Sequence, residues 1–165
     1  SKPKDPSFPA MLELFARTNV DLRDAESGLA PIHIDDEVSS LSAILLDEEY
    51  YRLLIDNRTS ADGVAILSAE GLIPFKAKAW LDLSARRANG QSVDEKSVRK
   101  HRNDICRLAV LLTGKERPFM SEAVRADMQR FMEAYESDPV DPKTLKISGI
   151  GAKQVVETLR SVYLR

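Results

Sequence analysis

The stretch from Leu72 to Arg87 constrains the fold of this chain most, because it predicts one long helix. Pro74 suits the first position of a helix, where its missing N–H leaves no bond unmade. Four apolar side chains then recur at helical spacing and form the predicted buried face: Phe75, Ala79, Trp80 and Leu83. Three charged side chains at i, i+4 and i+8 are predicted to form a solvated string of ion pairs: Lys78, Asp82 and Arg86.

Lys76 belongs to neither set, because it lies on the flank of the apolar stripe, next to Phe75 and four residues before Trp80. A lysine at such a place is either a surface residue whose stem covers apolar groups or a charge directed into a cleft. The functional interpretation starts from these two alternatives.

Strand and helix patterns divide the chain. Strand candidates fill the first 70 residues: 10–15, 31–34, 41–46 and 64–67. Besides the Lys76 helix, helix candidates cover 47–57, about 94–112, 121 to about 135, and about 152–164, with Asp47 and Ser121 as caps. This order predicts an α+β fold in which residues 1–70 carry a small sheet and residues 71–165 form a helical lobe.

Bulk composition limits the partners. The formal net charge of −2 gives no overall attraction to nucleic acid or to an anionic membrane. No apolar run approaches the ~18 residues that a membrane span needs, so we expect no membrane partner. The one cysteine, Cys106, excludes an internal disulfide and favours a reducing compartment, which we expect to be the cytoplasm.

Asp104, in the run Lys100-His-Arg-Asn-Asp-Ile105, is the second candidate site residue. It is either one half of an ordinary surface ion pair with Lys100 or Arg107, or it flanks the inner face of its helix as Lys76 does. Two successive helices that pack together could bring Lys76 and Asp104 into one cleft. Such a pair could bind a nucleotide phosphate and orient a hydroxyl or a metal-bound water.

Three other side chains are candidate ligands or nucleophiles. Glu13, a lone acid within a strand candidate, either faces solvent on an edge strand or completes a carboxylate cluster that holds metal. His101 falls on the inner helix face, and we expect it to be buried and hydrogen-bonded. Cys106 neighbours that face and is predicted to be a core residue.

The run Gly149-Ile-Gly-Ala-Lys153 precedes the last helix and resembles the Gly-h-Gly turn of a helix-hairpin-helix, which grips the DNA backbone through its amides. The pattern is short, and an ordinary glycine-rich helix start is the favoured interpretation.

Four segments together resemble bacterial AbiEii-like nucleotidyltransferases, the toxin-type proteins of abortive-infection and type IV toxin–antitoxin systems. They read Met-Leu-Glu-Leu-Phe, Leu-Ser-Ala-Ile-Leu-Leu-Asp-Glu-Glu-Tyr-Tyr, Leu-Ile-Pro-Phe-Lys-Ala-Lys-Ala-Trp-Leu-Asp-Leu and Lys-His-Arg-Asn-Asp-Ile-Cys-Arg-Leu. The resemblance covers residues 5–135. It implies a sheet of the polymerase-β type, of which residues 10–70 would be a remnant, with residues 1–70 the C-terminal part of the nucleotidyltransferase core.

The resemblance also implies a reaction and its residues. NMP would pass from NTP, with Mg²⁺, to a hydroxyl of tRNA, another RNA or a protein, and a cognate antitoxin would be a partner. Lys76 matches the family lysine that contacts the triphosphate, and Asp104 matches the aspartate that positions the acceptor or the metal. Glu13 is a weaker match to the strand acid that binds metal.

The chain departs from the family in one respect, because it contains no Gly-Ser turn followed by an Asp-x-Asp pair. Ser1 stands where an initiator Met would be, so we expect it to be a cloning remnant of a longer natural protein. The missing motifs either lie upstream of Ser1 or were lost. In both cases we expect these 165 residues alone not to transfer nucleotides. The alternative function is a non-catalytic module that binds nucleic acid or protein through the Gly149–Lys153 turn.

Overall fold

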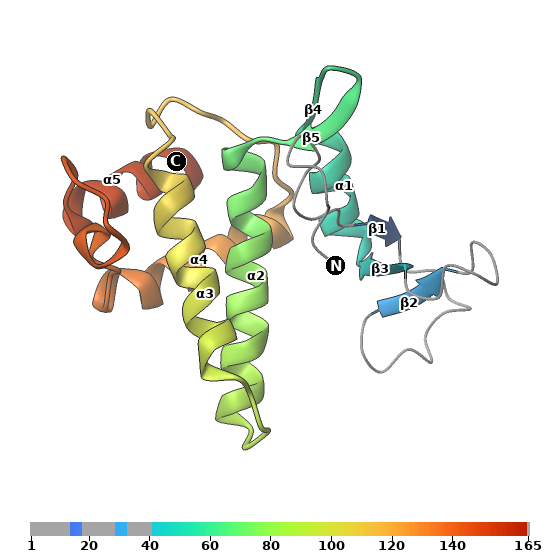
Figure 1. The fold of residues 1–165 in the computed structure, drawn as a ribbon, viewed down its shortest axis with the longest axis horizontal. Coiled ribbons are helices and arrows are strands. Elements are labelled where there is room, and N and C mark those ends of the chain that lie inside the picture. Colours follow the sequence, from blue (N-terminus) through green and yellow to red (C-terminus); the bar gives the residue numbers. More distant parts are fainter. Residues whose placement is uncertain (1–13, 18–28, 33–40, 165) are drawn as a thin grey trace, which may run out of the picture. The chain divides into compact units, whose positions relative to one another are not determined.

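The computed structural model describes residues 14–17, 29–32 and 41–164, with side chains from residue 47 onward (Figure 1). The chain divides into two compact units, residues 1–52 and 53–165, and each is described by itself. The α+β class is confirmed, since strands occur in both units and helices dominate the second.

The first unit contains a three-stranded sheet in the order β1-β3-β2. Its strands are β1 (Leu14–Arg17), β2 (Leu29–Ile32) and β3 (Leu41–Leu46), of which β1 runs parallel and β2 antiparallel to β3. The predicted strand at 41–46 is confirmed. The strand predicted at 10–15 overlaps β1, but residues 10–13 lie outside the described part of the chain, and Glu13 lies there with them.

Helix α1 (Glu48–Asp56) follows, and it begins where the sequence predicts. The Tyr50 N–H donates to Asp47 Oδ1 at 2.9 Å, so Asp47 is the predicted cap.

The second unit opens with a hairpin of β4 (Arg58–Ala61) and β5 (Val64–Leu67). Asp62 and Gly63 both have positive φ, 51° and 78°, as the right-handed twist of a tight hairpin requires. Residues 64–67 form the predicted strand. Such a short, wholly apolar run predicts a buried strand, and this expectation is wrong, because Val64 is 59% exposed and Ile66 43% exposed. The apolar run is one arm of a two-stranded ribbon, not a strand within a covered sheet.

Helix α2 (Ala69–Ala88) begins five residues earlier than predicted, with Ser68 as its cap residue, so Pro74 lies inside the helix. Proline has no N–H to give to the carbonyl four residues before it, and here that carbonyl belongs to Glu70. The Tyr163 hydroxyl donates to the Glu70 carbonyl oxygen at 2.8 Å. A distant side chain thus supplies the bond that Pro74 cannot make, and the helix continues through it.

The predicted buried face of α2 is also wrong in detail. The predicted set, Phe75, Ala79, Trp80 and Leu83, is only partly covered, whereas the fully buried residues are Gly71, Ile73, Pro74 and Ala77. The reason is that α2 packs against two helices, α3 and α4, so its buried stripe runs between them.

The remaining helices are α3 (Glu95–Ala109), α4 (Glu122–Ser137), the short 3₁₀ helix η2 (Pro142–Leu145) and α5 (Ala152–Tyr163). Asp94 and Ser121 cap α3 and α4, since their side chains accept from the N–H groups of Lys96 and Val124. Helices α2 and α3 lie side by side, and α4 crosses behind them (Figure 1). Apolar side chains from all four α-helices of this unit fill the core: Ile73, Ile105, Val124, Met128, Phe131, Met132, Tyr135, Val155 and Leu159.

Candidate functional site

The structure brings Lys76 and Asp104 together. Lys76 comes from α2 and Asp104 from α3, and Lys76 Nζ lies 4.0 Å from Asp104 Oδ2. Their side chains are 21% and 24% exposed, so both are held by their helices yet reach solvent. The prediction that two successive helices place this amine and this carboxylate beside each other is confirmed.

Asp104 has a second cationic neighbour on its own helix. Arg107 Nη1 lies 3.2 Å from Asp104 Oδ1, so each carboxylate oxygen faces a different cation. This i,i+3 pair is the surface ion pair that the sequence offered as one interpretation of Asp104. It holds the carboxylate in place while Arg107, which is half exposed, extends toward solvent.

His101 lies on α3 one turn before Asp104 and is partly buried. Its Nδ1 atom is buried and has no hydrogen-bond partner within the described residues, so the prediction of a hydrogen-bonded histidine is wrong at this atom. Burial lowers the pKa of the His101 imidazole below its ordinary 6.5, and the Lys76 ammonium lowers it further, against the opposite effect of Asp104. The ring is therefore neutral at pH 7 and lies within the electrostatic reach of both site residues.

Cys106 is fully buried, as predicted. Burial raises the pKa of its thiol, and the neighbouring Tyr135 and Arg107 oppose that only in part. A protonated thiol inside the core is a packing group and not a nucleophile.

Lys78 provides a second lysine–aspartate contact on α2. Its Nζ lies 3.0 Å from Asp82 Oδ1 and 3.9 Å from Asp127 Oδ2 of α4. Asp127 also pairs with Arg130, and only 11% of its side chain is exposed. The predicted string of ion pairs is thus half right: Lys78 pairs with Asp82, but Arg86 donates to Gln91 instead.

The residues that are described do not make a metal centre. No three His, Cys, Asp or Glu side chains among them gather as metal ligands. The metal assignment to Glu13 falls outside the described part of the chain.

The Gly149–Lys153 turn has one property of the helix-hairpin-helix turn that it resembles. Gly149 has φ +83° and open space around it, so it forms an exposed left-handed turn before α5. The Gly151 N–H, however, donates to Gln154 Oε1 at 2.9 Å, and Lys153 lies 3.9 Å from Glu157. One amide and the lysine of the turn are therefore already engaged within the helix.

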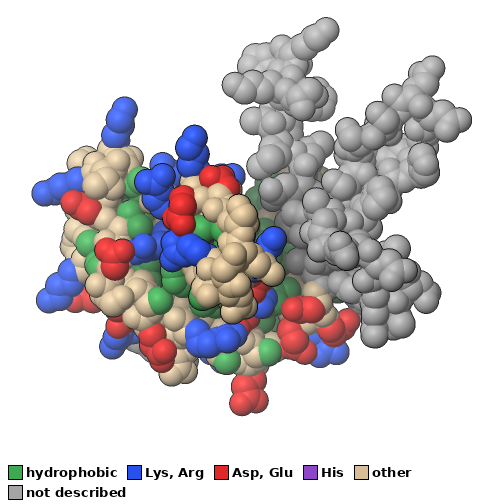
Figure 2. All heavy atoms as spheres, turned by 90° about the horizontal axis from the view of Figure 1, so that it is seen from below, with side chains coloured by type: hydrophobic (Ala, Val, Ile, Leu, Met, Phe, Trp, Pro, Cys, Tyr) green, Lys and Arg blue, Asp and Glu red, His purple; other side chains and the backbone are tan. Residues whose placement is uncertain are grey.

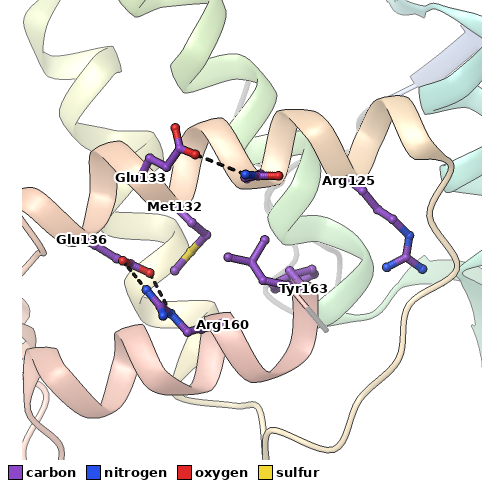
Figure 3. A pocket seen from close by; sticks show the side chains of 8 residues that line it. Arg125, Met132, Glu133, Glu136, Arg160 and Tyr163 are labelled. Carbon is purple, nitrogen blue, oxygen red and sulfur yellow. Dashed lines mark hydrogen bonds and ion pairs between the residues drawn. The ribbon is translucent and has the colours of Figure 1, made fainter.

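A separate hollow of about 530 Å³ lies between α4 and α5 (Figure 3). Arg160 and Glu136 form an ion pair across it, and Gln129 donates to Glu133 along α4. Lys76 and Asp104 do not line this hollow. Since most of its polar side chains bond one another, it presents no convergent set of free groups for a ligand among the described residues.

One face of the described residues mixes charges. In the face shown in Figure 2, Lys and Arg side chains alternate with Asp and Glu, without a continuous basic area. None of the described helices has the length and apolar character that crossing a bilayer requires.

No family model, curated protein or solved structure matches this chain. The resemblance to AbiEii-like nucleotidyltransferases and the roles it implies therefore stay predictions, and the geometry of the described residues carries the functional interpretation.

Proposed function

We propose that Lys76 and Asp104 form the helix-borne part of a nucleotidyl-transfer site, in a toxin-type nucleotidyltransferase that passes NMP from NTP to an RNA or protein hydroxyl. One observation carries the proposal: an ammonium and a carboxylate from separate helices meet at 4.0 Å and both remain accessible to solvent. A purely structural pair needs no such access.

Each group has a task that suits its chemistry. Lys76 is a mobile point charge that can leave Asp104 for the more highly charged triphosphate of an incoming NTP. Asp104, fixed by Arg107, can accept a hydrogen bond from the acceptor hydroxyl and orient it toward the α-phosphorus. The O–P bond to the acceptor then forms as the bond to pyrophosphate breaks.

The described residues do not fit a Mg²⁺ site by themselves, since no carboxylate cluster accompanies Asp104 among them. The motifs that would hold the metal, a Gly-Ser turn with Asp-x-Asp, are absent from these 165 residues. We therefore expect this chain to need a further segment for activity.

The test measures labelled NMP transfer with Mg²⁺, each NTP and total tRNA, first by this chain and then by the full-length natural protein. We expect no transfer by the chain alone. In the full-length protein, Lys76→Ala and Asp104→Ala should each lower transfer at least about 100-fold, the loss expected when a positioned charge is removed from a transition state.

Two matched controls come from the other side of α2. Lys78→Ala removes the same residue type with an interhelical aspartate at nearly the same distance, and Asp82→Ala removes an exposed carboxylate. Both should keep transfer within about threefold, a change of well under 1 kcal/mol. Equal losses in the Lys76 and Lys78 variants would reject the proposal. Clear transfer by the chain alone would reject the expectation that it needs a further segment.

The alternative is a non-catalytic module that binds nucleic acid, and the exposed left-handed Gly149 turn favours it. Binding of labelled RNA and DNA at about 50 and about 200 mM salt separates the two. A steep salt dependence that Lys153→Ala weakens, together with no transfer activity, would support the module.

A further inference from the structure

We propose that His101 is the general base of the Lys76–Asp104 site and takes the proton of the attacking hydroxyl. This inference rests on the proposed function and deepens it, since it adds the proton acceptor that the lysine–aspartate pair lacks.

The need for another base follows from the contacts of Asp104. Its Oδ2 faces Lys76 and its Oδ1 faces Arg107. A hydroxyl that lost its proton to this carboxylate would have to displace one of two cations. Asp104 can therefore hold the hydroxyl as the acceptor binds. The hydroxyl has one proton, so this proton must turn from Asp104 to a neutral acceptor before the attack.

His101 meets the geometric requirement. It precedes Asp104 by three residues on α3, so the two side chains lie one turn apart on the same side of the helix. Lys76 of α2 faces that side, because it pairs with Asp104 and also acts on the His101 ring. The three groups thus lie on the sides of α2 and α3 that face each other.

The chemistry of the ring agrees with this geometry. Nδ1 is buried without a partner in the described chain, an arrangement that costs free energy and that a purely structural histidine would avoid by making a hydrogen bond. Burial, Lys76 and Lys100 lower the pKa of His101, and Asp104 raises it. Helix α5 and η2 also pack against α3, but their described residues add no charge that shifts this pKa.

The proposed step balances in protons and electrons. The acceptor oxygen attacks the α-phosphorus, its proton moves to Nε2 of the partly exposed His101 ring, and the α–β phosphoanhydride bond breaks to release pyrophosphate. The imidazolium that forms lies beside the Lys76 ammonium. This repulsion returns the proton to solvent or to the departing pyrophosphate, which restores the neutral ring for the next turnover.

The first test compares His101→Gln and His101→Asn with wild type in the full-length protein. Both amides are polar and cannot take the proton. We expect kcat to fall about 100-fold or more in both, as for loss of a general base, while KM for NTP changes less than about threefold. The acid limb of the wild-type kcat profile, which reports protonation of the base below pH 6.5, should disappear. Wild-type kcat and an unchanged acid limb in both variants would overturn the inference.

The outcome separates this inference from the proposed function. If Lys76→Ala abolishes transfer but the His101 variants do not, only the base assignment fails. If the full-length protein transfers no nucleotide, or Lys76→Ala has no effect, the proposed function itself fails.

A second test needs no activity. An NMR titration of this chain follows the two histidines, and the His101 signal is assigned by its loss in His101→Gln. We expect His101 to titrate below 6.5 and its pKa to rise in Lys76→Ala, with no comparable change in Lys78→Ala. A His101 pKa that does not change in Lys76→Ala would show that the two groups do not lie close together and would overturn the inference.

Discussion

Lys76 and Lys78 lie two residues apart on α2, about 200° around the helix from each other, with the buried Ala77 between them. Each reaches an aspartate on a neighbouring helix, at 4.0 Å for Lys76 and Asp104 and at 3.9 Å for Lys78 and Asp127. By residue type and distance the two contacts are alike. They differ in what surrounds the aspartate.

On the Lys78 side, both the lysine and the interhelical aspartate have a second charged partner. Asp127 is almost fully buried and has Arg130 as a second cation, while Lys78 also pairs with Asp82. On the Lys76 side the aspartate is more exposed, and the neighbouring His101 keeps a buried ring nitrogen without a partner in the described chain. The comparison teaches that an interhelical ion pair does not by itself mark a site. Accessible charge and a polar atom without a partner distinguish the side that we propose to be functional.

The largest expected effect on stability concerns the Lys78 side, where the aspartate is buried. Asp127→Asn removes a carboxylate that is held between Lys78 and Arg130, so we expect the free energy of unfolding to fall by about 2 kcal/mol. Asp104→Asn should cost less than about 1 kcal/mol, because its pairs are more exposed. Urea unfolding at neutral pH measures both. If Asp104→Asn proved the more costly change, the Lys76 side would be the structural one.

A smaller effect concerns the helix that places both lysines. Pro74 lies within α2, two residues before Lys76, and the Tyr163 hydroxyl supplies the bond that Pro74 leaves unmade. Tyr163→Phe should lower the free energy of unfolding by about 1 to 2 kcal/mol, since it orphans the Glu70 carbonyl. In a Pro74→Ala background the restored N–H can bond that carbonyl, so the same change should cost about 1 kcal/mol less. Equal costs in the two backgrounds would mean that Tyr163 acts through packing alone.

Features that depend on neighbouring residues were predictable from the sequence. The caps at Asp47, Asp94 and Ser121 each satisfy an N–H within three residues, and all three begin helices where expected. The contact between Lys76 and Asp104 was also predictable, because successive helices joined by a short turn pack against each other.

Features that depend on distant residues were not predictable from the sequence. The sequence pattern places Pro74 at the start of its helix, since nothing local shows that Tyr163, 93 residues after Glu70, repairs the helix at that point. The exposure of Val64 and the partial burial of Phe75 depend on which elements cover them, which no local pattern encodes. The unpartnered nitrogen of His101 belongs to the same class, since its apolar spacing predicts only that the residue faces inward.

The smallest expected effect is a pH dependence of stability that concerns the Lys76 side alone. It follows from the lowered pKa of His101. Well above pH 6.5 the ring is neutral in both folded and unfolded chains, so it contributes no pH dependence. As the pH falls below 6.5 the unfolded chain takes up the proton first, which favours unfolding until the pH also passes the folded pKa. The stability of wild type relative to His101→Gln should therefore decline as the pH falls through 6.5 toward the lower folded pKa, as measured by urea unfolding at each pH. Lys76→Ala removes one cause of the low pKa, so it should flatten this decline, and Lys78→Ala should not. A decline that is the same in both lysine variants would remove the electrostatic difference between the two sides of α2.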